Sequence, residues 1–282
     1  MKIIFIADLF VEDGILGGGE LNNEEFICIA DSAGHDIIKV NSKYVTSRTI
    51  LENQNAKFIV ANFVQLNEEA KSLLAEKADY IIYEHDHKYL PLRDPAKYPN
   101  YRAPKDRIIN YDFYKNAKAV LCQSTFHANI ARANLDITNI HSAGGNLWSN
   151  ESLKKLQEMC DKPKQGKCSV MRSNIPHKNT IDAVRFCDYK KWDYDLIQED
   201  SYLKFLELLG ANDKFVFFPQ TPETLSRVVV EARMMGMKVI TNDKVGASQE
   251  TWFEKKGGDL IKVMRQKRID IPNMVFDFFQ GS

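Results

Sequence analysis

Residues 215–242 constrain the fold more than any other part of the chain. Residues 215–219 form an apolar run typical of a buried strand. Pro222 suits the first turn of a helix and Gly236 suits its end, after which Val239 and Ile240 begin a second strand. Strand, helix and strand in this order predict a βαβ unit with two parallel strands.

This unit carries two glutamates that suit ligand binding. Glu223 is expected in the first turn of the helix, where unpaired backbone N–H groups favour a bound phosphate. Glu231 follows eight residues later, about two turns along nearly the same helix face. One carboxylate can therefore contact a ligand while the other holds its far end.

A Glu, seven residues and a second Glu in a late βαβ unit resemble the donor-binding signature of GT-B glycosyltransferases. The resemblance is to the large, mostly retaining family that uses nucleotide sugars, and it extends to Ala232 and Gly236. It implies an α/β fold of two facing Rossmann-like domains. It also implies that Glu231 binds the donor ribose and that Glu223 acts on the donor sugar. The donor-site loop would comprise Thr224, Leu225 and Ser226, the last two where the family usually has Phe-Gly.

Length and composition fit such a protein. The 282 residues suffice for two domains, and the 38 basic residues balance the 38 acidic ones, so no global charge attracts nucleic acid or acidic lipid. Five cysteines without a Cys-x-x-Cys pair indicate reduced thiols. The apolar N-terminal run is interrupted at Asp8 and is too short for a signal peptide. We expect a cytoplasmic protein, in the host cytoplasm if it is viral.

Strand-like and helix-like segments alternate along the chain, which predicts parallel βα units. The small, polar segment 141–150 is the best linker candidate. We therefore expect an acceptor-side domain over 1–144 and a nucleotide-sugar domain over 151–282, whose last helix is free to pack on the first domain. The expected strands are 2–9, 37–40, 58–63, 79–83, 119–122, 137–140, 167–171 and 194–197, followed by the two of the βαβ unit. Ligands are expected beyond the carboxyl ends of these strands.

Candidate phosphate-binding residues follow the first strand of each expected domain: a glycine-rich loop in the first domain and two cations in the second. Gly18 and Gly19 open a helix and allow close approach of the backbone to a phosphate, although a plain flexible loop explains them equally. Arg172 and Lys178 follow the strand that ends at residue 171. By family resemblance these four residues hold the donor diphosphate. The alternative for the two cations is a solvated surface position.

The sequence Glu-His-Asp-His at 84–87 ends a strongly apolar strand. Strand alternation predicts that His85 and His87 point the same way. Family resemblance favours His85 and Asp86 as residues that face the transferred sugar. Two histidines supply at most two metal ligands, and Asp193 and Asp195 precede a strand rather than follow one, so no metal is expected. A satisfied core histidine remains the alternative for either imidazole.

Residues 88–118 combine eight basic with three acidic residues and six aromatic ones. This interleaving suits contacts with phosphates and stacking on bases or sugar rings, although a solvated loop with locally packed tyrosines explains it as well. The acceptor-binding residues predicted here are Lys97, Tyr98, Tyr101, Arg102 and Lys105.

Two segments of the first expected domain suggest an acceptor. Residues 16–22 and 83–87 resemble segments of compact bacteriophage glycosyltransferases, some of which modify hydroxymethylated DNA bases. We therefore expect a UDP-sugar donor, a hydroxymethylated cytosine in double-stranded DNA as acceptor, and no membrane partner. Two alternatives stay open. In the first, the acceptor is a polysaccharide or small metabolite. In the second, the chain is a catalytically silent module that binds a nucleotide sugar or DNA.

Overall fold

The computed structural model describes residues 1–14 and 17–281, which form two compact units. The first comprises Met1–Leu147 with Arg268–Ser282, and the second comprises Trp148–Lys267. Leu16, at the start of the phage-like segment, lies outside the described residues, as does residue 15 of the preceding loop.

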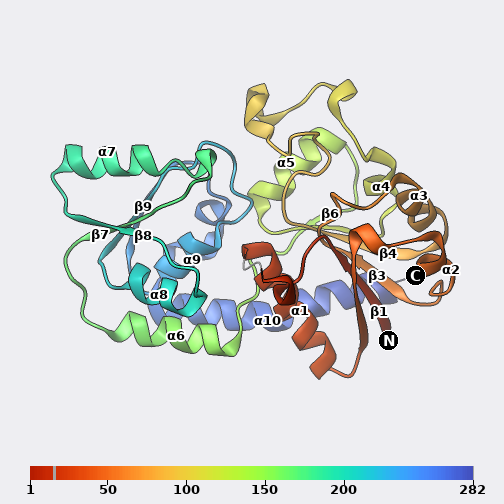
Figure 1. Cartoon of the computed structure of the whole chain (residues 1–282), viewed down its shortest axis with the longest axis horizontal. Helices are drawn as coiled ribbons and strands as arrows, with labels where there is room; N and C mark the ends of the chain where they lie inside the picture. The colour runs from red at the N-terminus through yellow and green to blue at the C-terminus, as the bar shows by residue number, and fades with distance from the viewer. Residues whose placement is uncertain (15–16, 282) are drawn as a thin grey trace. The chain divides into compact units, whose positions relative to one another are not determined.

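The first unit is built on a six-stranded parallel sheet in the order β2-β1-β3-β4-β5-β6, of which Figure 1 labels β1, β3, β4 and β6. The strands are β1 (Lys2–Ala7), β2 (Asp36–Asn41), β3 (Lys57–Val60), β4 (Asp79–Glu84), β5 (Val120–Cys122) and β6 (Ile140–Ser142). The helices are α1 (Gly18–Ser32), α2 (Ser47–Leu51), α3 (Glu68–Lys77), α4 (Tyr111–Asn116), α5 (Thr125–Leu135) and the last part of α10 (Gly257–Gln280).

Both faces of this sheet are covered, because successive strand residues point to opposite sides. On one face Ile4 and Ile6 of β1 pack in a cluster that includes buried residues of α3, α4 and α5. On the other face Ile3 and Phe5 pack in a cluster with residues of α1 and α10. The sheet is therefore the middle layer of three, as in a Rossmann-like domain.

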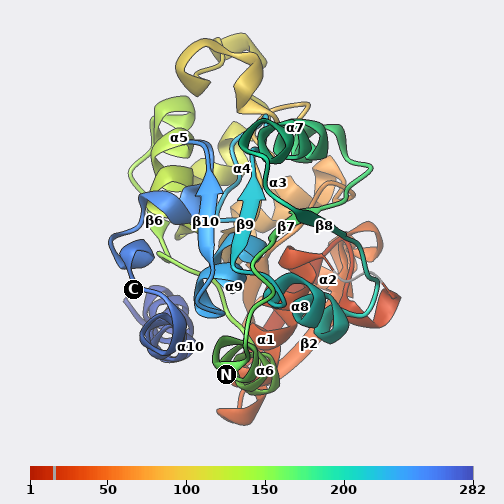
Figure 2. The ribbon, with the colours of Figure 1, turned by 90° about the vertical axis from the view of Figure 1, so that its left-hand side faces the viewer.

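The second unit has a four-stranded parallel sheet in the order β10-β9-β7-β8, which Figure 2 shows side by side. Its strands are β7 (Cys168–Met171), β8 (Tyr194–Ile197), β9 (Lys214–Phe217) and β10 (Lys238–Thr241). Its helices are α6 (Asn150–Asp161), α7 (Thr180–Lys190), α8 (Tyr202–Gly210), α9 (Arg227–Met234) and the first part of α10. Two clusters of buried apolar side chains cover its faces. The predicted α/β class with two Rossmann-like domains is confirmed.

The boundary between the two units falls between Leu147 and Trp148, inside the predicted linker 141–150, although both side chains are buried in the cores of the units. Two other local features differ from the expectations. The strand expected at 137–140 is found at Ile140–Ser142. Helix α6, for which no helix was predicted, begins at Asn150, where the Ser149 side chain caps it by accepting a hydrogen bond from the Ser152 N–H. Among the described residues, no helix combines the length and hydropathy needed to cross a bilayer.

Candidate functional site

Glu231 lies on α9 and is only 2% exposed. Its Oε1 accepts hydrogen bonds from the Trp148 indole N–H at 2.9 Å and from the Tyr202 hydroxyl at 2.7 Å. The Arg227 Nε lies 3.6 Å from the same oxygen. Three neighbours therefore fix the orientation of the carboxylate.

The neighbours of Glu231 also support one another. The Arg227 guanidinium lies 4.4 Å from the centroid of the Trp148 ring, and one of its nitrogens donates to the Tyr202 hydroxyl. Burial raises the pKa of Tyr202, and the negative charge of Glu231 adds to this, so the phenol stays protonated as a donor. Trp148 and Tyr202 come from distant parts of the chain, and no spacing in the sequence indicated them. Arg227 stands four residues before Glu231, a spacing that favours an ion pair on a helix.

The prediction that Glu223 lies in the first turn of the helix was wrong. Its backbone instead forms a parallel bridge with Val245, in which its N–H donates to the Lys244 carbonyl at 2.8 Å. Helix α9 begins at Arg227, because Ser226 has a φ of 72°, in the left-handed region that helical residues do not adopt. The two glutamates therefore do not share a helix face.

Glu223 lies beside Lys178, one of the residues predicted to bind the donor diphosphate. The Lys178 Nζ is 2.7 Å from Glu223 Oε1, and the two side chains are 25% and 12% exposed. Lys178 ends a short 3-10 turn, Pro176–Lys178, before α7, and the Gln220 N–H donates to the His177 carbonyl at 2.8 Å. This backbone contact ties the Lys178 turn to the loop after β9. The structure thus brings a sequence-predicted cation and acid together.

Arg172 and residues 224–226, the other residues of the second unit predicted to bind the donor, range from exposed to fully buried. Arg172 follows β7 as predicted, and it is exposed. Thr224 is half-buried and Leu225 is fully buried, so the Leu225 side chain serves packing. Ser226 is 8% exposed, and its hydroxyl has no hydrogen-bond partner among the described residues. A buried, unsatisfied hydroxyl at the N-terminus of α9 is suited to a ligand with acceptor oxygens.

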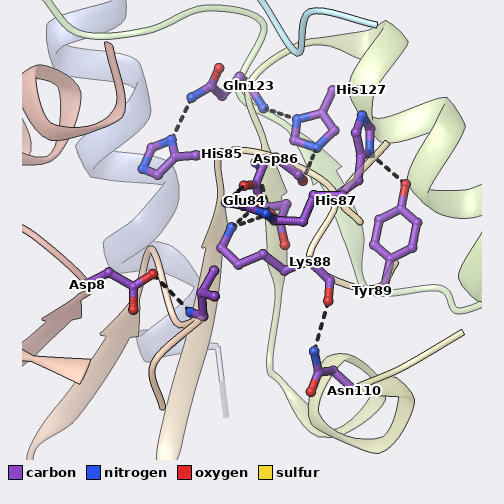
Figure 3. A network of polar contacts seen from close by, with 12 residues as sticks. Asp8, Glu84, His85, Asp86, His87, Lys88, Tyr89, Asn110, Gln123 and His127 are labelled. Carbon is purple, nitrogen blue, oxygen red and sulfur yellow. Dashed lines mark hydrogen bonds and ion pairs between the residues drawn. The ribbon is translucent and has the colours of Figure 1, made fainter. Parts of the chain in front are cut away.

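In the first unit, Lys88 lies between two carboxylates where β4 ends (Figure 3). Its Nζ is 2.6 Å from Glu84 Oε1 and 2.7 Å from Asp86 Oδ1. The Tyr114 hydroxyl donates to the other oxygen of Glu84, and Arg93 lies 3.0 Å from Asp86. Glu84 is 0% exposed and Lys88 3%, so the pairs form in a poorly solvated environment.

The charged groups of this cluster shift one another's pKa values. Burial acts to raise the pKa of Asp86, but Lys88 and Arg93 together outweigh burial and hold that pKa below its usual range. Burial raises the pKa of Glu84, which lies deeper, and Lys88 offsets only part of this. The pKa of Asp86 is therefore lower than that of Glu84, so Asp86 is the more fully ionised of the two carboxylates, in the position predicted to face the sugar.

His85 is held by hydrogen bonds at both ring nitrogens. Its Nε2 donates to Asn23 Oδ1 at 2.6 Å. Its Nδ1 accepts from the Gln123 amide at 2.5 Å (Figure 3), so the imidazole is neutral. Gly19 packs beside it, because a Cβ placed on Gly19 would lie 3.6 Å from His85 Cγ. Gly18 is exposed at the start of α1, which confirms that the glycine segment opens a helix. The structure therefore brings Gly19 and His85 together.

The prediction that His85 and His87 point the same way was wrong. Strand β4 ends at Glu84, so strand alternation does not continue through 85–87. The two side chains extend in opposite directions in Figure 3, and His87 packs against His127 with ring centroids 4.9 Å apart. Burial lowers the pKa of His87 to about 4, which keeps this imidazole neutral. His127 Nε2 donates to the Asp86 carbonyl at 3.0 Å and supports the turn.

The predicted acceptor residues lie on, or directly after, a series of short 3-10 turns. Two of these turns are Pro95–Lys97 and Pro99–Tyr101, and a third is Lys105–Arg107. Lys97, Arg102 and Lys105 are exposed, whereas Tyr98 and Tyr101 are half-buried. Asn134 of α5 anchors the segment through hydrogen bonds with the Tyr101 carbonyl and the Ala103 N–H, both 2.8 Å. Within the described residues, no group of three or more His, Cys, Asp and Glu side chains is arranged to hold a metal ion.

Comparison with known proteins identifies the fold. No protein-family model and no curated protein sequence matches the chain. Among solved structures, Anabaena Alr3699/HepE in complex with UDP and glucose matches with a TM-score of 0.54 and 14% identity, over 96% of this chain and 90% of that one. The catalytic domain of starch synthase IV from Arabidopsis thaliana, bound to ADP and acarbose, matches with a TM-score of 0.60 and 9% identity, over 96% and 92%.

A third similar structure is an alpha-glucosyltransferase in complex with UDP and a 13-mer DNA containing a central A:G mismatch. It matches with a TM-score of 0.50 and 10% identity, over 96% of this chain and 90% of that one. The structural neighbours are GT-B glycosyltransferases, and the chain has the GT-B fold.

Proposed function

We propose that the protein is a glycosyltransferase that moves a sugar from a UDP-sugar to a hydroxyl group. The observation that carries this proposal is the buried Glu231 of α9, whose carboxylate is oriented by Trp148, Tyr202 and Arg227. A buried carboxylate with a fixed orientation suits charge-assisted hydrogen bonds to two ribose hydroxyls. The GT-B fold, and the UDP bound by two of the similar proteins, support this assignment.

In the proposed reaction the acceptor oxygen bonds to the anomeric carbon while the bond from that carbon to the diphosphate breaks, and the hydroxyl proton of the acceptor passes to an oxygen of the leaving diphosphate. Negative charge then grows on the leaving diphosphate. Lys178 and Arg172 supply positive charge, and the N-terminus of α9 with the Ser226 hydroxyl supplies donors. Glu223 binds the donor sugar and positions Lys178 through their ion pair. None of these roles requires a metal ion.

The residues of the first unit act on the sugar and the acceptor. The Gly18 and Gly19 backbone contacts the diphosphate, and the neutral His85 and ionised Asp86 orient the sugar and the incoming hydroxyl. Because both ring nitrogens of His85 are engaged, its role is orientation rather than proton transfer. Retention at the anomeric carbon follows the family resemblance.

The proposed acceptor is a hydroxymethylated cytosine in double-stranded phage DNA. The exposed Lys97, Arg102 and Lys105 of the basic, aromatic segment 88–118 support it, because exposed cations suit phosphate contacts. The DNA held by the similar alpha-glucosyltransferase is a second support. An enzyme that acts on a flipped base also needs aromatic faces, which Tyr98 and Tyr101 provide.

Replacing Glu231 with glutamine is expected to weaken UDP-glucose binding about 10- to 100-fold, because hydrogen bonds to a charged group contribute about 1.5–3 kcal/mol. Glutamine keeps an acceptor oxygen for Trp148 and Tyr202, so the fold should persist. Titration calorimetry measures the affinity. Glu207→Gln on α8, whose side chain is 47% exposed, is the matched control and should bind normally. Equal affinity of the Glu231 variant and the native protein would contradict the ribose role, and no turnover of any nucleotide sugar by native protein would favour a silent binding module.

Salt dependence tests the DNA acceptor. Binding to DNA that contains hydroxymethylcytosine should weaken steeply with salt, and replacing Lys97, Arg102 and Lys105 with alanine should flatten the slope by about three ion equivalents. The exposed Lys77, Lys154 and Lys256 provide a control triple with the same charge change. A slope that is the same in both triples and in native protein would remove the DNA assignment and favour a polysaccharide or small metabolite as acceptor.

A further inference from the structure

A pocket of about 470 Å³ opens in the first unit beyond the carboxyl ends of β3 and β4. Its lining includes Phe63 from the loop after β3, Lys71 from α3, and Lys88, Arg93 and Asn110 from the long segment after β4. Sequence reasoning pointed to positions 97–105 of that segment and missed this pocket. Its position is where open parallel sheets bind ligands.

Lys71 is a buried ammonium group whose acidic partner is exposed. Its side chain is 10% exposed, whereas that of Glu68, 2.7 Å away, is 84% exposed. Asn110 Oδ1 holds the same ammonium at 2.9 Å, and Asn110 Nδ2 donates to the Lys88 carbonyl (Figure 3). Because the Glu68 side chain is largely in solvent, it can turn away from Lys71, and an entering anion can take its place beside the ammonium group.

Arg93 and Lys88 add positive charge to the same pocket. Arg93 is 51% exposed and contacts Asp86 through one nitrogen, at 3.0 Å. A guanidinium has five N–H donors in a planar fork, which suits the oxygens of a phosphate. Three cations and a single acid, Glu68, therefore line the pocket, and Glu84 and Asp86, which pair with Lys88 and Arg93, are not among its lining residues.

The remaining wall is apolar. Phe63 and Leu90 are buried in it, whereas Val64 and Ile109 at its edge are 54% and 40% exposed. Asp8 fixes this edge, because its carboxylate accepts from the Val64 N–H at 2.9 Å. Exposed apolar side chains beside buried cations suit a ligand with an anionic group attached to an apolar or aromatic body.

We infer that this pocket binds the phosphate group of a phosphate-bearing molecule, with Lys71 and Arg93 on the phosphate oxygens and the apolar wall against the attached ring. Its assignment to the acceptor rests on the proposed function, because Lys88 and Arg93 also hold Asp86, the residue proposed to orient the acceptor hydroxyl. The phosphate site itself depends only on the first unit.

Phenyl phosphate is the probe, because it joins one ring to one phosphate. Titration of the full chain with phenyl phosphate, followed by NMR or calorimetry, should show saturable binding, with inorganic phosphate weaker and benzyl alcohol weaker still. Lys71→Met should weaken phenyl phosphate binding at least tenfold, and Lys71→Arg should retain most of it. Lys77→Met, an exposed lysine on the same helix, should bind as the native protein does.

Binding is measured without a nucleotide sugar, so it is separate from the donor site. Equal binding by native protein, Lys71→Met and Arg93→Met, or equal affinity for phenyl phosphate and benzyl alcohol, would overturn the phosphate site. If Lys71→Met fails to fold, Arg93→Met decides, because that side chain is half exposed. Comparison of cytidine monophosphate with glucose 6-phosphate distinguishes a nucleotide source from a sugar phosphate. If the native protein binds phenyl phosphate but does not turn over UDP-glucose, that result would contradict the proposed function and leave the phosphate site in place.

Discussion

Replacing Lys178 with methionine is expected to lower kcat for transfer from UDP-glucose by about 100- to 1000-fold, or about 3–4 kcal/mol of transition-state stabilisation. The side chain is only 25% exposed and is held 2.7 Å from Glu223, so the position of its charge is fixed, as the proposed diphosphate role requires. Because the negative charge on the diphosphate grows only as its bond to the sugar breaks, kcat should fall more than KM rises. Steady-state kinetics with UDP-glucose measure both quantities.

The matched control is Lys190→Met at the exposed end of α7, which should leave kcat unchanged. A Glu223→Gln variant separates the two members of the pair, because it leaves Lys178 charged and removes only its partner. A Lys178→Met enzyme with a kcat within a few fold of native would contradict the diphosphate role, whatever the effect of Glu223→Gln.

Replacing Lys88 with methionine is expected to lower the free energy of unfolding by about 3–5 kcal/mol, the usual cost of breaking a buried ion pair. The substitution leaves Glu84, at 0% exposure, and Asp86 without the ammonium that lies between them. Urea denaturation followed by circular dichroism measures the change.

A second substitution tests the electrostatic cause. Glu84→Gln in the Lys88→Met background removes the uncompensated charge while keeping an acceptor for the Tyr114 hydroxyl. The double variant should therefore recover part of the lost stability, as replacement of a whole buried pair often does. A loss of less than about 1 kcal/mol in Lys88→Met, or a double variant less stable than the single one, would contradict the ion-pair account.

Strong local patterns predicted the architecture of the chain. The strand predicted at 194–197 coincides with β8, and Gly236, with a φ of 79°, follows α9 as expected of a helix-ending glycine. The start of α9 was predicted too early, because the left-handed Ser226 and the bridge from Glu223 to Val245 are tertiary features. Burial of the expected linker was missed for the same reason, since small and polar residues also occur where chain segments pack closely.

The candidate site was predicted only in part. Lys178 and Glu223 came from family spacing, and the structure brings them into contact. Trp148 and Tyr202, which orient Glu231, are single aromatic residues far from it in sequence, so only the fold could reveal them. Lys71 was also missed, because a lysine on an acidic helix looks solvated until its burial is known.

A crystal structure of the protein with UDP-glucose tests the central claim most directly. The account predicts the ribose hydroxyls on the Glu231 carboxylate, and the diphosphate beside Lys178 and the N-terminus of α9. A nucleotide bound elsewhere, with Glu231 still contacting only Trp148, Tyr202 and Arg227, would contradict it.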